Sequence, residues 1–293
     1  MRLSSENSTC PNSRRSELDN PVRAYYEHSA EQEWRRLERP DDGVLEWALT
    51  CRALTGNLPP TGRVLDIGGG PGRYAIWLAQ HGYRVVLADL SPALLEVARA
   101  QVAESGMSAM VEAIVEADAR DLSPWADASF DAVLSLGPFY HLSNAADRDR
   151  AAQEMYRVVR PGGIAFVALM PRYAFLRRTL ALADERRHLG SAAFVSRMLF
   201  DGVFINDIPG RFTGGYGFRP EDVAPFFARH GLQPIDLLAI EGMIPDLQGA
   251  LAEFAVSDPA GYPATLEMIA CTANDPSILG LANHLLFIGR RSQ

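Results

Sequence analysis

The chain has 293 residues, 47% of them apolar, and its 28 basic and 36 acidic side chains give a formal net charge of −8. This length predicts one large domain or slightly more, with a sizeable core, and the acidic balance gives no electrostatic reason to bind nucleic acid or an anionic membrane. All the basic residues are arginine, so the chain has no lysine for a pyridoxal Schiff base, a phosphate-binding P-loop or a general base.

The sequence carries no sign of a membrane span, a signal peptide or a metal site. The longest strongly apolar run, at 164–170, has seven residues, whereas a membrane helix needs about 20. Residues 1–20 are polar and lack the hydrophobic centre of a signal peptide, so we expect a disordered tail and a cytoplasmic protein. The three cysteines and six histidines are scattered without metal-ligand spacing, and no metal is expected.

The first part of the chain predicts helices, and then strands that alternate with helices. Residues 21–60 have the apolar spacing of two helices, with a break at 40–43. Residues 61–170 contain expected strands at 63–68, 83–89, 111–117, 130–136 and 164–170, and expected helices at 73–81, 91–106 and 145–159. Short apolar strands alternating with such helices indicate βαβ units. The predicted fold class is therefore α/β, with a doubly wound, mostly parallel sheet.

The second half of the chain is less regular. Residues 171–219 form an insertion rich in aromatic side chains, and a helix is expected at 221–230 and a strand at 232–240. A second insertion with two helical patches follows at 241–282, and a strand is expected at 283–290. Residues 220–293 thus complete the core around the second insertion.

A glycine-rich turn joins the first strand of the core to its first helix, in the sequence Asp66-Ile67-Gly68-Gly69-Gly70-Pro71-Gly72-Arg73. Free backbone N–H groups and the lack of side chains let a polar ligand approach such a turn closely. A dinucleotide fold needs a third glycine where this chain has Arg73, which disfavours NAD(P). Nineteen residues after Gly70, Asp89 ends the second strand, where a carboxylate is placed to accept hydrogen bonds from ribose hydroxyls. The two features together indicate a nucleoside-bearing ligand.

Five segments in the correct order resemble the motifs of class I S-adenosylmethionine-dependent methyltransferases. These segments are 66–72, Asp89, 117–119, 134–142 and 160–163. The resemblance covers residues 20–293 and is to members that modify small molecules, some of them in natural-product pathways. It implies a Rossmann-like sheet of seven strands whose last strand is antiparallel. It also implies S-adenosyl-L-methionine as the cofactor and S-adenosyl-L-homocysteine as the product.

The resemblance also implies a cofactor site at the carboxyl ends of the first four strands. The glycines border the methionine part, the carboxylate that ends the second strand takes the ribose, and residues after the third and fourth strands face the adenine and the sulfonium. Two aromatic residues belong to an N-terminal helical lid at 21–60 that folds over the cofactor. The implied cofactor-binding residues are Tyr26, Trp34, Asp66, Gly68, Gly69, Gly70, Asp89, Leu90, Asp118, Ala119, Leu136 and Gly137.

The chemistry mainly requires alignment, because a sulfonium is already an activated methyl donor. The protein has to place a nucleophile in line with the S–CH3 bond and exclude water, and a base is needed only where the nucleophile carries a proton that must leave. Three side chains are hypotheses for a catalytic base: Glu27 in the lid, His141 after the fourth strand and His284 at the start of the last strand. His81 and His230 precede glycines at helix ends and are interpreted as structural.

The aromatic side chains of the 171–219 insertion favour a flat, mostly apolar acceptor, although most of them are expected in the core of that segment. The residues expected to meet the substrate are Tyr25, Tyr140, Tyr173, Phe204 and Tyr216. The hypothesis is SN2 methyl transfer to a nucleophilic C, N or O of a small aromatic or indole-like molecule of secondary metabolism. An NAD(P)-dependent oxidoreductase and a non-catalytic S-adenosylmethionine-binding module stay open as alternatives. The expected partner is this small molecule, without nucleic acid or membrane, and the protein is expected to be a monomer or homodimer.

Overall fold

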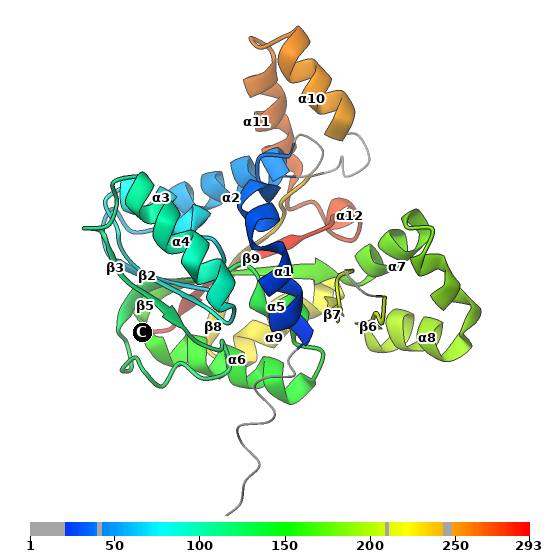
Figure 1. The fold of residues 1–293 in the computed structure, drawn as a ribbon, viewed down its shortest axis with the longest axis horizontal. Coiled ribbons are helices and arrows are strands. Elements are labelled where there is room, and N and C mark those ends of the chain that lie inside the picture. The colour runs from blue at the N-terminus through cyan, green and yellow to red at the C-terminus, as the bar shows by residue number, and fades with distance from the viewer. Residues whose placement is uncertain (1–20, 40–42, 209–210, 243–247) are drawn as a thin grey trace, which may run out of the picture.

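A mixed β-sheet is the central feature of the computed structural model, which describes residues 21–39, 43–208, 211–242 and 248–293 (Figure 1). Seven of its strands are β1 (Arg63–Ile67), β2 (Arg84–Asp89), β3 (Val111–Glu116), β4 (Phe130–Ser135), β5 (Val159–Pro171), β8 (Leu232–Ala239) and β9 (Leu285–Arg291). They lie in the order β3-β2-β1-β4-β5-β9-β8. The first five are parallel, and β9 is antiparallel to both of its neighbours. The predicted doubly wound sheet with an antiparallel last strand is confirmed.

Helices cover both faces of the sheet. Successive side chains of a strand point to opposite sides, so apolar residues on both sides are buried by these helices. The first face carries α2 (Gly43–Asn57), α3 (Arg73–Gln80) and α4 (Pro92–Glu104), and the other carries α6 (Ala145–Val158) and α9 (Pro220–Arg229). Val64 packs on the first face and Leu65 on the second, and both are fully buried. The predicted start of α4 is also confirmed, since the Ser91 side chain accepts a hydrogen bond from the Leu94 N–H.

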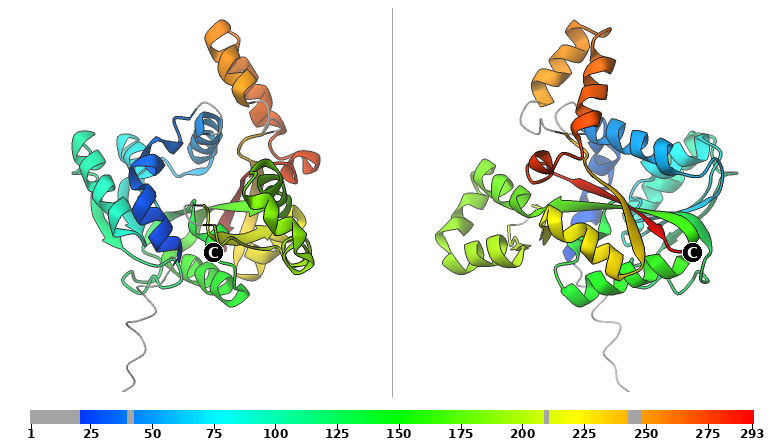
Figure 2. Two further views of the ribbon diagram at one scale, coloured as in Figure 1. Left: turned by 45° about the vertical axis from the view of Figure 1, so that its right-hand side comes forward. Right: turned by 180° about the vertical axis from the view of Figure 1, so that it is seen from behind.

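Two further short strands in the described residues raise the strand count from the seven expected to nine. They are β6 (Val203–Ile205) and β7 (Gly214–Phe218), and they form an antiparallel pair. β7 also pairs in parallel with Met170 and Pro171 at the end of β5. The same segment contains α7 (Arg172–Ala181), η1 (Glu185–Gly190), α8 (Ala192–Ser196) and η2 (Arg197–Asp201). Figure 2 shows it as a lobe at one end of the sheet.

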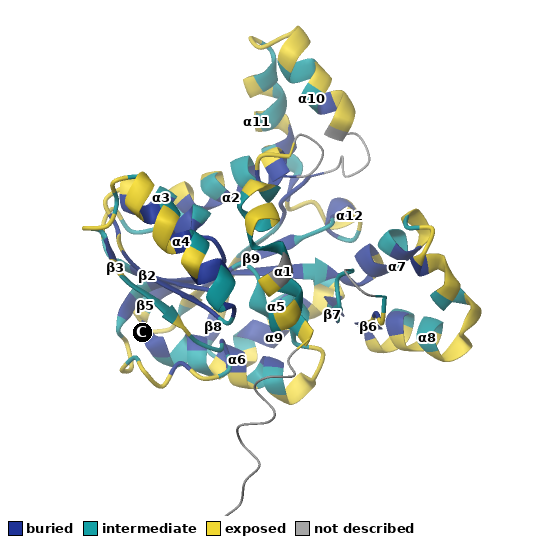
Figure 3. Cartoon of the chain, viewed as in Figure 1, coloured by how far each residue is buried: buried dark blue, intermediate teal, exposed yellow. Residues whose placement is uncertain are grey.

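The N-terminal segment and the second insertion lie on different parts of the sheet. α1 (Pro21–Arg36) packs beside α4, and α5 (Pro138–His141) follows β4. The second insertion contains three helices in place of the two expected patches: α10 (Gln248–Ser257), α11 (Tyr262–Thr272) and α12 (Pro276–Leu279). α10 and α11 project away from the sheet, and Figure 3 shows that they are largely exposed or half-buried.

The histidines interpreted as structural do end helices. His81 caps α3 and His230 caps α9, and each is followed by a glycine with φ near +86° or +85°. The expected tail at 1–20 and the centre of the expected break, at 40–42, lie outside the described residues. Among the helices that the structure describes, none combines the length and the apolar character needed to cross a bilayer.

Candidate functional site

A cavity of about 710 Å³ lies at the carboxyl ends of β1, β2 and β4, with α1 on its outer side. Ligands of open α/β sheets bind at this edge. Most of the residues that the sequence nominates line this cavity, although they come from distant parts of the chain. They are Tyr25, Tyr26, Asp66, Gly68, Gly69, Gly70, Asp89, Leu90, Asp118, Ala119, Leu136, Gly137, Tyr140, His141 and His284.

The glycine turn after β1 needs glycine for close approach as well as for its backbone angles. Gly68 and Gly70 have φ of +72° and +55°, in the region that side chains disfavour. A Cβ atom at Gly68 would collide with the ring of Pro138, and one at Gly69 would lie 2.6 Å from Oδ2 of Asp66. The turn therefore presents backbone without side chains to the cavity, and the carboxylate of Asp66 lies next to it.

The Asp66 carboxylate is fully buried, and neither of its oxygens has a hydrogen-bond partner among the described residues. Burial, together with the nearby Asp89, raises the pKa of Asp66 to about 7. An unpaired buried carboxylate is costly, and a cationic or hydrogen-bonding ligand group in the cavity would satisfy it.

Two backbone N–H groups hold the Asp89 carboxylate in one orientation. Its Oδ2 accepts a hydrogen bond from the Gly70 N–H and its Oδ1 from the Ser91 N–H, both at 2.9 Å. Burial raises the pKa of Asp89 to about 6, against the opposite effect of these two N–H groups. Each carboxylate oxygen keeps a second lone pair, so the side chain can still accept hydrogen bonds from a vicinal diol.

Asp118, which follows β3, also lines the cavity. Its Oδ2 lies 2.6 Å from Nη2 of Arg120, whose Nη1 lies 3.1 Å from Oδ2 of Asp147. The Arg120 N–H also donates to Oδ1 of Asp118 at 2.8 Å. The carboxylate is therefore fixed by its own turn, and all three side chains line the cavity.

The other end of the cavity is lined by rings that contact one another. Tyr25 and Tyr26 come from α1, Tyr140 and His141 from α5, and Phe212 from the first insertion; we name this group the aromatic box. The His141 ring lies 4.8 Å from that of Tyr140 and 4.9 Å from that of Phe212. The Tyr26 hydroxyl and His141 Nε2 are hydrogen-bonded at 2.9 Å. Burial lowers the pKa of His141 to about 4, so its imidazole is neutral at physiological pH.

Two nominated residues of α1 lie outside the cavity wall. The Glu27 carboxylate accepts a hydrogen bond from Arg23 at 3.0 Å and its side chain is 41% exposed, so the structure does not support Glu27 as a base. The Trp34 ring packs under the Arg73 guanidinium, at 4.2 Å, and its carbonyl accepts a hydrogen bond from Arg73 Nε. Trp34 therefore supports the wall rather than forming it.

Three nominated aromatic residues of the first insertion also lie outside the wall. Tyr173 is 50% exposed, because α7 turns the other face, with Ala174, Arg177, Arg178 and Ala181, toward the cavity. Phe204 is fully buried and stacks on Phe175 at 4.8 Å. Tyr216 lies under the guanidinium of Arg148, at 3.5 Å, beside a second, smaller cavity. Phe212 is the aromatic side chain of this insertion that lines the main cavity.

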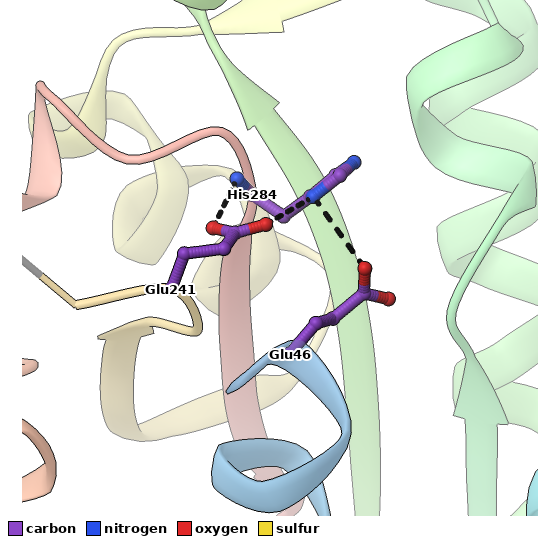
Figure 4. A group of neighbouring side chains, drawn as sticks. All are labelled: Glu46, Glu241 and His284. Carbon is purple, nitrogen blue, oxygen red and sulfur yellow. Dashed lines mark hydrogen bonds and ion pairs between the residues drawn. The ribbon is translucent and has the colours of Figure 1, made fainter. Parts of the chain in front are cut away.

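Sequence reasoning missed several charged side chains at the cavity. Arg36 and Glu241 line it, and Glu46 is buried beside them. Figure 4 shows Glu241 and Glu46 on two sides of His284. The contact between Glu241 and His284 follows from the pairing of β8 with β9, in which Ala239 lies opposite Leu285. This register brings the residues just beyond the two strands, 241 and 284, together.

Known proteins match this chain over parts of its length. Residues 65–167 match the family model described as "Methyltransferase domain". An uncharacterized protein of Mycobacterium tuberculosis is 35% identical over 156 residues, with 49% of this chain and 54% of that protein covered. The chain thus spans about half the length of the first curated relatives that it matches. Demethylmenaquinone methyltransferase of Thermus thermophilus is 32% identical over 175 residues, with 58% of this chain and 70% of that protein covered.

The fold is also similar to that of a solved structure from Burkholderia thailandensis. That protein is 1,6-didemethyltoxoflavin-N1-methyltransferase with bound 1,6-didemethyltoxoflavin and S-adenosylhomocysteine. The TM-score is 0.53, the sequences are 14% identical, and 99% of this chain and 94% of that chain are covered. At this identity the likeness concerns the fold alone.

Proposed function

Because the chain belongs to the class I S-adenosylmethionine-dependent methyltransferases, we propose that it moves a methyl group to a nucleophilic carbon, nitrogen or oxygen of a small aromatic or indole-like acceptor. S-adenosylmethionine, when bound, supplies a methyl group on a positively charged sulfur and leaves as S-adenosylhomocysteine. The observation that carries the proposal is that one cavity joins the glycine turn and Asp89 to the aromatic box. A donor and a flat acceptor can therefore meet end to end.

The residues around the glycine turn fit the chemical groups of this cofactor. Asp66 has two buried oxygens without a partner, which suits the positive charge of the methionine part. Asp89 keeps free lone pairs for the two ribose hydroxyls, while Leu90 and Ala119 offer apolar contacts for the adenine and Asp118 lies at its edge. Leu136 and Gly137 line the passage toward the aromatic box.

The aromatic box supports an aromatic acceptor. Rings stack or meet edge to face with other rings at centroid distances of about 4.5–7 Å, and the box presents such rings from α1, α5 and the first insertion. The proposed acceptor class thus rests on the rings of the aromatic box themselves.

Two measurements test the proposed function. Calorimetry of the purified protein should detect binding of S-adenosylmethionine and S-adenosylhomocysteine, and no binding of nicotinamide dinucleotides. Metabolite extracts incubated with the protein and a trideuteromethyl donor should then yield a compound with the corresponding mass shift. Tight nicotinamide binding would favour the oxidoreductase alternative. Donor binding without transfer to any indole, phenol or amine of a broad panel would favour a non-catalytic binding module.

Donor binding is expected to tighten as the pH rises from 5.5 to 8. A bound cation favours the ionised form of Asp66, and burial holds the pKa of that carboxyl at about 7 in the free protein. Below that pH, binding must first remove the proton, so affinity falls and a proton is released on binding. Calorimetry in two buffers of different ionisation enthalpy measures this release. Asp66→Asn should remove most of the rise and leave the smaller part, at the acid end, that Asp89 contributes with its pKa of about 6. A pH-independent affinity of the unaltered protein would contradict the assignment of Asp66.

A further inference from the structure

Four charged side chains from four segments meet at the acceptor end of the cavity. Arg36 comes from α1, Glu46 from α2, Glu241 follows β8, and His284 precedes β9. Arg36 donates to both oxygens of Glu46, at 2.5 and 2.9 Å. Glu241 accepts from the His284 backbone N–H at 2.9 Å and from His284 Nδ1 at 2.6 Å. Glu46 lies 4.0 Å from the same Nδ1 (Figure 4). We name these side chains the charged quartet.

The hydrogen bonds of the charged quartet determine the tautomer of His284. An ionised carboxylate only accepts hydrogen bonds, so the short contact with Glu241 places a proton on Nδ1. In the neutral imidazole, Nε2 then carries the lone pair. Figure 4 shows Nε2 on the side of the ring away from both carboxylates, and His284 lies in the cavity wall. The ring is therefore fixed with its basic nitrogen available to a ligand.

Within the charged quartet the charges balance when the imidazole is protonated, since two carboxylates then oppose two cations, and Glu33 also pairs with Arg36, at 3.3 Å. The titratable and charged groups that face the ring are Glu241 after β8, Glu46 on α2, Arg36 on α1 and Tyr140 on α5. Burial alone would lower the pKa of His284, but Glu241 and Glu46 outweigh burial and Arg36 and raise it. Acceptance of a proton at Nε2 is thus favoured by the surroundings.

His141, the other histidine of the cavity, lacks these features. No carboxylate contacts its ring among the described residues, its Nε2 is already hydrogen-bonded to the Tyr26 hydroxyl, and burial lowers its pKa to about 4. Its Nδ1 is buried without a hydrogen-bond partner among the described residues, but an imidazole with so low a pKa is a weak base and is poorly suited to take a proton. Both histidines are sequence-based hypotheses for the base, and their surroundings distinguish them.

A metal ion is the competing interpretation of the charged quartet. One ligating atom each from Glu46, Glu241 and His284 lies within 4.8 Å of the others. However, Arg36 occupies both oxygens of Glu46, and His284 occupies both oxygens of Glu241. A divalent ion at Nδ1 of His284 would have to displace the proton that this nitrogen donates to Glu241, and it would lie close to the positively charged guanidinium of Arg36. The arrangement is therefore one of hydrogen bonds and protons rather than of free metal ligands.

We propose that His284 is the catalytic base of the methyl transfer, that Glu241 is its positioning residue, and that the acceptor is an N–H heterocycle or a phenol. This inference rests on the proposed function. In the step, Nε2 takes the proton from the N–H or O–H group, and the pair that held it remains available on the nucleophile. The nucleophile forms its bond to the methyl carbon while sulfur keeps the pair of the broken S–C bond. The imidazolium afterwards returns the proton to water.

The first test needs no acceptor. In protein labelled with ¹³C at its histidine rings, the His284 resonance, assigned by its loss in His284→Gln, should titrate at a higher pH than an ordinary histidine. Glu241→Gln should lower that midpoint, because it removes the charge that favours the imidazolium. Asp149→Asn is the matched control: Asp149 also pairs with a histidine, His230, at 2.9 Å, outside the main cavity. A His284 midpoint that Glu241→Gln leaves in place would overturn the role of Glu241.

The second test measures turnover of phenols and N–H heterocycles, with O-methylated and N-methylated analogues as controls. His284→Gln should lower kcat by about 10²- to 10⁴-fold, whereas His230→Gln should not. Glu241→Gln should lower kcat and move the acid limb of the kcat/KM profile to lower pH. Donor affinity and thermal unfolding, measured on each variant, identify a folding defect. Full turnover by a folded His284→Gln, or a tightly bound metal whose removal abolishes turnover, would overturn the proposal. A failure of donor binding in the unaltered protein would instead overturn the proposed function.

Discussion

Replacing Asp89 with alanine is expected to weaken binding of S-adenosylmethionine by more than tenfold. The variant removes the acceptor of hydrogen bonds from two ribose hydroxyls, and such bonds to a charged group contribute about 1.5–3 kcal/mol each. It also leaves the backbone N–H groups of Gly70 and Ser91 without the carboxylate to which they donate hydrogen bonds, both at 2.9 Å, in the structure. The glycine turn then loses a contact that holds it in its ligand-binding form. Isothermal calorimetry with the donor and with S-adenosylhomocysteine measures the effect.

The matched control for this variant is Asp207→Ala. The Asp207 side chain is 77% exposed and pairs with Arg187 away from the cavity, so its loss should leave donor affinity within about twofold. Asp89→Asn should fall between the two, because the amide keeps one accepting oxygen without the charge. An Asp89→Ala protein that binds the donor with unchanged affinity would show that the carboxylate does not touch the ribose.

The core of the fold could be predicted because its strands are apolar on both faces and its helices have clear ends. The predicted strands and helices between 63 and 170 match β1–β5, α3, α4 and α6 to within a residue or two, apart from the start of β5, and the short α5 was not predicted. There, Pro161, Gly162 and Gly163 predicted a break before the strand, but β5 already begins at Val159. The register between β4 and β5 shifts at this point, and Gly162 has a φ of +74°. A Pro-Gly-Gly sequence can thus form an irregularity within a strand as well as its boundary.

The first insertion could not be predicted at the same level. β6 and β7 have three and five residues, and three of the five in β7 are glycines. Such strands lack the alternation of apolar and polar side chains on which sequence reasoning depends. The aromatic side chains of the segment were visible, but their direction was not. Phe204 faces a small core with Phe175 and Met198, whereas Phe212 faces the cavity.

The acceptor end of the site depended on contacts between distant segments. Glu241 and His284 are 43 residues apart and meet only through the pairing of β8 with β9. In α1, by contrast, a local signal was available for Glu27. Arg23 lies four residues before it, a spacing that places the two side chains on one helix face and favours an ion pair. Local spacing thus indicates an ion pair for Glu27, whereas the contact between Glu241 and His284, on which the proposed base rests, depends on the tertiary structure.

Replacing Arg36 with alanine is expected to lower the free energy of unfolding by about 3 kcal/mol. Arg36 donates to both oxygens of Glu46, whose side chain is 9% exposed, so truncation leaves a buried carboxylate without its strongest partner. We expect a loss at the low end of the range for a broken buried ion pair, because the Arg36 side chain is 28% exposed. The loss should shrink as the pH falls, since the stranded carboxyl of Glu46 then takes up a proton. Urea unfolding at several pH values measures both effects.

Arg52 provides the matched control, because it pairs with Glu267 in the same two-pronged geometry, at 2.6 and 2.8 Å, with both side chains more than half exposed. Arg52→Ala should cost no more than about 1 kcal/mol. Adding Glu46→Gln to Arg36→Ala should recover most of the loss, since the nearly fully buried carboxylate is then neutral and only Glu33, whose side chain is 20% exposed, lacks its contact with Arg36. Equal costs for the two arginine variants would mean that Glu46 is solvated. Deleting residues 1–40 would remove Arg36 together with Tyr25 and Tyr26, which line the cavity. The double variant keeps both tyrosines, so it isolates the effect of the charge.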